Sequence, residues 1–276
     1  MKEITLREMQ IIENNLLLQF DAVCKKHNLR YYLDGGTLLG ALCYDGFIPW
    51  DDDIDLKMPR PDYEKLLALR SEFPQDVSVE APCEAKCEYT FSKLVDNRTV
   101  LKEIGPNTVK ETGIYIDIFP MDGHPVGEKA CKRHYAKLSR LNSLFHESQY
   151  GYGGFCSSSS VFARLKGRIY RCLYSPWCLY RRLTKLAKRY SYDSSEEVGL
   201  LIEGDPIREK FMKKWLEPPA MMEFEGRQFP APNEAEKHLS IFYRKPISRK
   251  LYYQNLPKIP SAHNHLVYWK EDPCQD

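Results

Sequence analysis

The chain has 276 residues, a length that suits one large domain or a catalytic core with a second lobe. Hydrophobic residues make up 43% and charged residues 28%, which excludes a disordered or fibrous protein. The net charge of +2 does not single out a nucleic-acid-binding protein, and none is expected. No secretory signal or transmembrane run is recognised, and nine scattered cysteines fit reduced thiols, so we expect a cytoplasmic protein.

The beginning of the chain predicts a phosphate-binding turn. A helix is expected from a capping box at residues 5–8 to a stop at residues 27–28. A short aromatic strand over residues 30–34 then leads through the double glycine at 35–36 into a second helix that begins at Thr37. Strand, double glycine and helix in this order indicate a place where backbone amides bind phosphate.

The densest charge cluster is Asp-Asp-Asp-Ile-Asp at residues 51–55. If this stretch is an extended strand, Asp51, Asp53 and Asp55 share one face and Asp52 lies on the other. Neighbouring carboxylates on one face would then lie about 6.6 Å apart and repel each other by about 2.5 kcal/mol per pair at an effective dielectric of about 20. A solvated turn is the alternative, but the apolar residues on both sides indicate a partly buried strand edge.

Crowded carboxylates of this kind require a cation. An EF-hand is excluded, because its loop needs Gly and Glu where the chain has Leu56 and Asp62. A site for Mg²⁺, or for Mn²⁺, shared with substrate phosphates fits better. Asp117 is the candidate third carboxylate, because it is the only charge in the apolar strand predicted over 114–119. A hydrogen-bonded structural role for Asp117 is the alternative.

The other elements are read from periodicity and turn residues. Helices are expected over 63–73, 128–148, 161–173, 177–190 and 233–243, strands over 77–80, 89–95 and 114–119, and a hairpin turn at Glu225-Gly226. The glycine- and serine-rich residues between 151 and 160 predict a flexible loop. Helix and strand alternate through about residue 125, which predicts an α/β or α+β core there.

A basic stretch occupies residues 148–192, which hold nine Lys and Arg and no acidic residue. Aromatic residues are interleaved with these cations, so the helices predicted over 161–190 are basic and amphipathic. A peripheral contact with anionic lipid is one hypothesis. A solvated helical face over an ordinary core is the alternative. Binding of nucleic acid is the third hypothesis, because no nucleic-acid-binding motif accompanies the charge.

Three motifs occur in order along the chain, at residues 33–41, 46–55 and 117–120. Together they resemble the LicD family of phosphotransferases, which includes the fukutin-related proteins. The resemblance implies an α+β fold of the DNA polymerase β superfamily. Its nucleotidyltransferase-like core would have a mixed β-sheet flanked by helices. We expect this catalytic core over residues 1–125, and a mostly helical lobe that binds the acceptor over residues 126–276.

The resemblance also implies roles for individual residues. The two-metal Mg²⁺ site would be held by Asp53, Asp55 and Asp117, with help from Asp51. Asp117 would also be the candidate base for the acceptor hydroxyl. The pyrophosphate of the donor would contact Gly35, Gly36 and Thr37, and Lys93 could balance phosphate charge. A structural role is the alternative for Lys93.

Members of this family transfer a phospho-alcohol, commonly phosphocholine from CDP-choline, to a hydroxyl of a cell-surface glycan or its lipid-linked precursor, of the teichoic acid or lipopolysaccharide type. In physical terms the acceptor oxygen attacks the β-phosphorus of the CDP-alcohol and CMP leaves. Such an enzyme would work in the cytoplasm, at the inner face of the membrane. The alternatives are a nucleotidyltransferase that uses an NTP and releases pyrophosphate, and a non-catalytic member that binds glycan or lipid.

Overall fold

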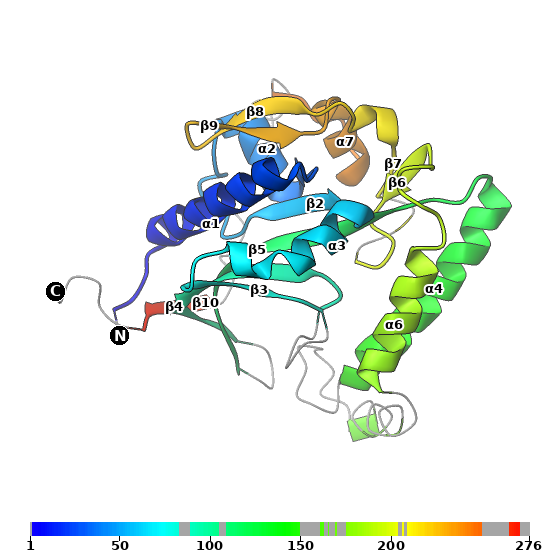
Figure 1. The fold of residues 1–276 in the computed structure, drawn as a ribbon, viewed down its shortest axis with the longest axis horizontal. Coiled ribbons are helices and arrows are strands. Elements are labelled where there is room, and N and C mark those ends of the chain that lie inside the picture. Colours follow the sequence, from blue (N-terminus) through cyan, green and yellow to red (C-terminus); the bar gives the residue numbers. More distant parts are fainter. Residues whose placement is uncertain are drawn as a thin grey trace.

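A mixed β-sheet forms the centre of the molecule (Figure 1). The computed structural model describes residues 2–82, 89–104, 109–149, 175–203, 209–249 and 265–270, with isolated positions at 161, 162, 165, 169 and 206. The main path of the sheet runs in the order β1 (Tyr32–Leu33), β2 (Asp55–Pro59), β5 (Val109–Gly123), β4 (Ser92–Ile104) and β10 (His265–Trp269). β2 and β5 are parallel, and the other neighbours on this path are antiparallel. The α+β class and the mixed sheet flanked by helices are confirmed.

Three short strands extend the sheet beyond this path. They are β3 (Val77–Glu80), which pairs with β4, and β6 (Glu197–Gly199) and β7 (Lys210–Met212), which follow the end of β5. The strands predicted over 77–80, 89–95 and 114–119 are therefore present. The last two are longer than expected because β4 and β5 pair with each other as a long antiparallel ribbon.

The first helix, α1 (Leu6–His27), begins and ends as its sequence predicts. Thr5 and Glu8 form both halves of the capping box, and Asn28 ends the helix in the left-handed conformation with φ 51°. Its apolar face is fully buried in the main core through Leu17 and Phe20. In Figure 1 this helix crosses the sheet beside β2 and β5.

Two further helices flank β2. They are α2 (Gly35–Tyr44) and α3 (Arg60–Ala68). The helix predicted over 63–73 is wrong in its bounds, since α3 begins earlier, with Pro61 in its first turn, and ends at Ala68. A separate 3₁₀ turn over Arg70–Glu72 follows, because the chain leaves helical geometry at Leu69.

The chain after residue 125 contributes both helices and strands. The described elements are α4 (Glu128–Gln149), α6 (Pro176–Ala187), β8 (Ala220–Phe224), β9 (Arg227–Ala231) and α7 (Ala235–Phe242), besides β6, β7 and β10. The β8–β9 hairpin turns at Glu225 and Gly226, which have φ of 51° and 74°, as predicted. The helix predicted from Asn233 begins later, because Glu234 precedes α7 and no side chain caps it.

These later elements pack in two places. α4 and α6 lie side by side at one edge of Figure 1 and bury Leu138, Leu183 and Ala187 between them and the segment at 201–202. The hairpin and α7 instead pack on α2 and join the main core through Phe224, Phe229 and Leu239. The boundary expected at residue 125 falls just after β5, and the division into a core and a lobe stays a prediction.

Part of the basic stretch lies outside the described residues, namely the loop predicted over 151–160 and nearly all of the helix predicted over 161–173. The second basic helix is α6, which is shorter than the predicted 177–190. None of the helices in the described part of the chain combines the length and apolar character that a membrane span requires.

Candidate functional site

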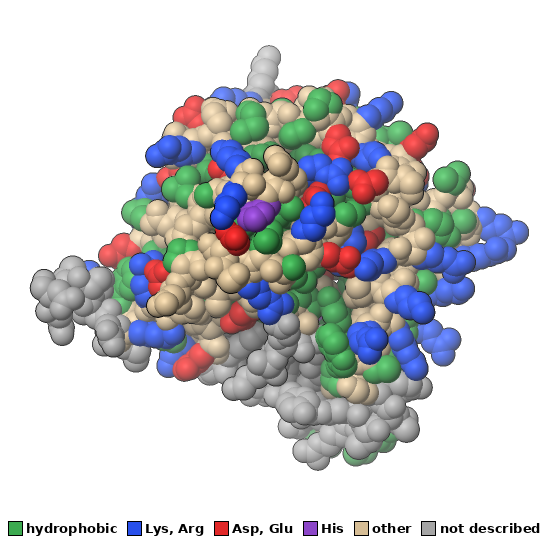
Figure 2. All heavy atoms as spheres, viewed as in Figure 1, with side chains coloured by type: hydrophobic (Ala, Val, Ile, Leu, Met, Phe, Trp, Pro, Cys, Tyr) green, Lys and Arg blue, Asp and Glu red, His purple; other side chains and the backbone are tan. Residues whose placement is uncertain are grey.

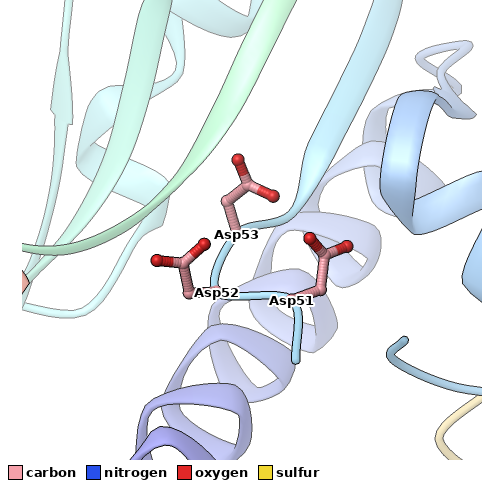
Figure 3. Close-up of side chains that lie close together, drawn as sticks. All are labelled: Asp51, Asp52 and Asp53. Carbon is pink, nitrogen blue, oxygen red and sulfur yellow. The ribbon is translucent and has the colours of Figure 1, made fainter. Parts of the chain in front are cut away.

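Three carboxylates come together in the loop before β2. Ligand oxygens of Asp51, Asp52 and Asp53 all lie within 4.8 Å of one another, and all three side chains are partly exposed (Figure 3). The alternation expected for an extended stretch is wrong, since β2 begins only at Asp55. The Asp51 N–H donates to the carbonyl of Ile48 at 2.9 Å, and this turn bends the chain. Asp52 therefore joins the cluster instead of facing away from it.

Asp55 and Asp117 are neighbours in the sheet. They are register partners in the parallel pair of β2 and β5, where adjacent strands lie about 4.8 Å apart. The Asp117 N–H donates to the carbonyl of Ile54 at 2.8 Å, which fixes this register. Two of the predicted metal ligands, more than 60 residues apart in the chain, are thus brought together at one end of β2, next to the acidic loop.

The electrostatics of this group are those of crowded carboxylates. Burial raises the pKa of Asp55 well above its usual value, and the negative charges of Asp53 and Asp117 raise it further. The donor set consists of carboxylate oxygens, which suit a hard cation such as Mg²⁺ or Mn²⁺. The residues present therefore fit the divalent ions expected from the sequence. The ligand roles of Asp51, Asp53, Asp55 and Asp117 stay predictions.

The double glycine lies against these carboxylates at the N-terminus of α2. A Cβ atom on Gly35 would lie 2.8 Å from Oδ2 of Asp55, and one on Gly36 would lie 2.6 Å from Oδ2 of Asp51. Gly35 also has φ of +51°, which favours glycine. Asp34, which precedes the helix, makes no side-chain hydrogen bond to its first amides. Gly35 is thus favoured by its backbone conformation, and a methyl group at either glycine would displace a carboxylate of the site.

Thr37 and Lys93, both expected at the phosphates, contact the carboxylate residues of the site. The Thr37 hydroxyl is 2% exposed and accepts a hydrogen bond from the Asp55 N–H at 2.9 Å. The Lys93 ammonium is buried 2.8 Å from Oδ1 of Asp117 and lies 3.1 Å from the centre of the Tyr115 ring. Both residues position the carboxylates in this structure, and their contact with phosphate stays a prediction.

A buried network beneath α2 was not recognised in the sequence. The Lys57 ammonium lies 2.6 Å from Asp34 and 2.9 Å from Glu209, and Nε2 of His238 lies 2.7 Å from Asp34. His238 stacks on Phe211 with ring centroids 3.9 Å apart. Part of the signal for Lys57 was present, because it is a charge between the apolar residues Leu56 and Met58.

The C-terminal half of the chain also reaches the acidic residues. Burial raises the pKa of Tyr243, and the negative charges of Asp34, Asp51, Asp55 and Asp53 raise it further. This residue follows directly after α7 and packs against the main core. A segment more than 100 residues after the first 125 therefore lies within electrostatic reach of the acidic residues.

A second candidate surface is the exposed face of α6. Arg181, Arg182 and Lys185 are exposed, and they form no ion pair with another residue in the described part of the chain. Trp177, at the start of the helix, is 50% exposed and stacks on Tyr180. Figure 2 shows Lys and Arg side chains gathered over this edge of the molecule, where α4 and α6 lie in Figure 1.

Comparison with known proteins bears on this geometry. Residues 28–150 match the family described as "LicD/FKTN/FKRP, nucleotidyltransferase domain". The chain is 29% identical over 248 residues to the lipopolysaccharide cholinephosphotransferase LicD of Haemophilus influenzae, which covers 88% of this chain and 91% of that relative. The chain is thus similar to the LicD family over residues 28–150, and to one protein of that family over most of its length.

Other relatives share shorter stretches with this chain. Mannosyltransferase regulator 4 of Saccharomyces cerevisiae is 33% identical over 120 residues, which is 41% of this chain and 10% of that protein. An uncharacterized protein of Rickettsia prowazekii is 40% identical over 50 residues, which is 18% of this chain and 19% of that protein. The LicD domain match contains every predicted site residue, and α1 lies before its first residue.

Proposed function

We propose that this chain is a metal-dependent phosphotransferase that moves phosphocholine from CDP-choline to a hydroxyl group of a cell-surface glycan or its lipid-linked precursor. The similarity to a lipopolysaccharide cholinephosphotransferase over 88% of the chain supports a glycan of the lipopolysaccharide type. A teichoic acid is a second acceptor of the same chemistry. A CDP-linked alcohol other than choline is the alternative donor, since the family resemblance implies the CDP group more directly than the alcohol.

One observation carries the proposal: five aspartates gather beside the glycine-rich N-terminus of α2. Asp51, Asp52 and Asp53 form one cluster, and Asp55 and Asp117 adjoin it at the edge of the sheet. A transferring phosphate brings negative charge to this end of the sheet, so carboxylates there require cations between them and the substrate. A purely glycan- or lipid-binding protein has no such requirement.

The proposed chemistry is a displacement at the β-phosphorus. Bound divalent cations would supply charge neutralisation on the attacking and leaving oxygens. The acceptor oxygen forms a bond to the β-phosphorus while the bond from that phosphorus to the CMP oxygen breaks, and CMP leaves with the electron pair. The proton of the acceptor hydroxyl moves to the carboxylate of Asp117.

The chain's own residues divide this work. The aspartates of the loop and Asp55 would hold the cations, and the backbone amides at Gly35 and Gly36 would bind the pyrophosphate of the donor. Lys93, 2.8 Å from Oδ1 of Asp117, orients the proposed base. Tyr243 lies within electrostatic reach of the aspartates, which suits a role of this later segment in holding the acceptor.

We further propose that the exposed cations of α6 contact anionic lipid at the inner face of the membrane. Arg181, Arg182 and Lys185 give the helix a positive face, and the half-exposed Trp177 suits the interfacial region of a bilayer. An acceptor carried on lipid would then be presented to the site. The test of this surface is given in the Discussion.

The test of the function is product analysis with the purified protein. The protein is incubated with Mg²⁺, lipopolysaccharide that lacks phosphocholine, and CDP-choline, CDP-ethanolamine, CDP-glycerol or CDP-ribitol in turn. We expect CMP and modified glycan from CDP-choline, and no product with EDTA. The Asp53→Asn, Asp55→Asn double variant, with its fold checked by circular dichroism, should lose turnover at least about 100-fold.

The outcomes separate the candidate functions. Pyrophosphate released from an NTP, with no CMP from any CDP-alcohol, would favour a nucleotidyltransferase. Unchanged turnover in the double variant would rule out the proposed metal site. A thermal shift by CDP-choline only when Mg²⁺ is present would support the donor independently of the acceptor, because a ligand of the native state raises the melting temperature.

A further inference from the structure

Glu13 of α1 is a buried acid without a recorded partner. Glu13 is 0% exposed, and neither carboxyl oxygen makes a hydrogen bond to any residue that the structure describes. An unpaired carboxyl in such surroundings costs several kcal/mol when charged. The adjacent Ile12 and the following Leu16 and Leu17 pack in apolar cores, where an apolar residue would satisfy the packing at this position equally well. The helix itself therefore does not explain an acid here.

The position of Glu13 points to the acidic loop. Gln10 lies three residues earlier, on the same face of α1, and its amide donates to the carbonyl of Asp51 at 2.9 Å. Figure 3 shows α1 directly behind the loop that carries the three aspartates. The face of the helix that bears Glu13 is thus in contact with the loop.

Electrostatics support the same placement. Burial raises the pKa of Glu13 well above its usual value, and the negative charges of Asp53, Asp52, Asp51 and Asp117 raise it further. Glu13 therefore lies within electrostatic reach of all three loop aspartates and of Asp117. In its charged form, a further carboxylate at such a crowded site is stabilised by a cation shared with its neighbours.

We infer that Glu13 supplies a further carboxylate to the divalent-cation site of Asp51, Asp52 and Asp53, an inference that rests on the proposed metal-dependent function. The site then includes a ligand from α1 as well as from the loop. The LicD domain match begins at residue 28, so Glu13 lies outside the segment in which the family motifs occur. Helix α1 thereby has a role in cation binding besides its role in the core.

The direct test is Mn²⁺ binding, measured by isothermal titration calorimetry on the full chain. We expect Glu13→Gln to weaken Mn²⁺ binding about tenfold or more, the usual effect of losing a group that supports a metal site. The metal-free Glu13→Gln protein should melt at the same or a higher temperature than wild type, because a crowded buried carboxyl is removed. A merely structural role predicts a lower melting temperature and unchanged Mn²⁺ affinity.

Asp21→Asn is the matched control. Asp21 is also a buried acid of α1, but its carboxylate accepts a hydrogen bond from Tyr31 at 2.8 Å and pairs with Lys25 at 2.6 Å. This variant should keep its Mn²⁺ affinity. Equal weakening in Glu13→Gln and Asp21→Asn would overturn the inference, because loss of charge from the helix would explain both.

A second variant, Glu13→Met, covers the case in which the Gln variant does not fold. Its side chain is apolar and of similar length, so it should fold, melt higher than wild type and bind Mn²⁺ as weakly as Glu13→Gln. If wild type binds Mn²⁺ and Glu13→Met binds it equally well, the inference about Glu13 is wrong and the metal site stands. If wild type itself binds no Mn²⁺, the metal site and the inference fail together.

Discussion

The ammonium group of Lys57 lies 2.6 Å from the carboxylate of Asp34, and both side chains are at most 5% exposed. The same ammonium lies 2.9 Å from Glu209, and Nε2 of His238 lies 2.7 Å from the other oxygen of Asp34. Asp34 immediately precedes the double glycine of α2. The pair therefore fixes the start of the candidate phosphate-binding helix, and it connects that helix to a segment more than 150 residues away.

Lys57→Met tests how much this pair contributes to stability. The substitution leaves Asp34 and Glu209 buried without their cation, so we expect the free energy of unfolding to fall by about 3–5 kcal/mol. Urea denaturation measures the change. Lys102→Met is the control, because its 3.0 Å pair with Glu111 is partly exposed and should contribute less than about 1 kcal/mol. Equal losses in the two variants would contradict this account of the buried pair.

Gly36→Ala tests the close approach of α2 and the acidic loop. The added methyl group would lie 2.6 Å from Oδ2 of Asp51, so that carboxylate must move while the backbone stays in place. We expect the free energy of unfolding to change by no more than about 1 kcal/mol, the helix preference of Ala offsetting the contact. Mn²⁺ affinity, measured by calorimetry, should fall about tenfold.

Gly40→Ala on the same helix is the matched comparison. Its methyl group would clash with the carbonyl oxygen of Gly46, which is backbone and cannot rotate away. We expect a loss of about 1–3 kcal/mol in the free energy of unfolding. The variant should retain its Mn²⁺ affinity where it remains folded. If Gly36→Ala destabilises the protein as much as Gly40→Ala and binds Mn²⁺ normally, the proposed contact with Asp51 has no role in metal binding.

Local signals in the sequence were sufficient to predict where several helices and turns begin or end. The capping box at Thr5 fixes the start of α1, and the left-handed Asn28 fixes its end. Glu225 and Gly226 mark the β8–β9 turn in the same way. These features depend on residues close to one another in the chain, so a single sequence contains what is needed to predict them.

The parts of the site that were missed depend on distant contacts. Asp52 joins the cluster because the chain bends at residues 48–51, and hydrophobic alternation gives no sign of that bend. Glu13 fits the helical pattern of α1 as an ordinary polar residue, and its burial follows from a loop about 40 residues later. Lys57 was harder to find, since its strand also holds Asp55 and its partner Glu209 lies far along the chain.

A pH dependence of stability follows from His124, which is 3% exposed and lies 2.5 Å from the Tyr135 hydroxyl through Nδ1. Burial, with the positive charges of Lys210 and His134, lowers its pKa to about 3. Below about pH 6.5 the unfolded chain binds a proton at His124 and the folded chain does not. The contribution of His124 to stability is therefore fully present above that pH and is lost as the pH falls towards 3. At pH 5 the free energy of unfolding should be lower by about 2 kcal/mol.

His124→Asn isolates this contribution, because the Asn amide can replace Nδ1 at Tyr135 and does not titrate. Urea denaturation at pH 7.5 and pH 5.0 gives the loss of stability for each protein. The variant should lose about 2 kcal/mol less than wild type between these two pH values. An equal loss in both proteins would mean that other groups are responsible for the acid sensitivity.

Removing the exposed cations of α6 tests the proposed membrane surface. The triple variant Arg181→Ala, Arg182→Ala, Lys185→Ala should bind anionic vesicles about 10- to 100-fold more weakly than wild type, since each surface cation contributes up to about 1 kcal/mol. Flotation with vesicles that contain phosphatidylserine and with neutral vesicles measures the difference, which should shrink at high salt. The control removes three exposed cations elsewhere, Lys214, Arg227 and Lys237. If the control weakens binding equally, net charge is responsible and α6 has no special role.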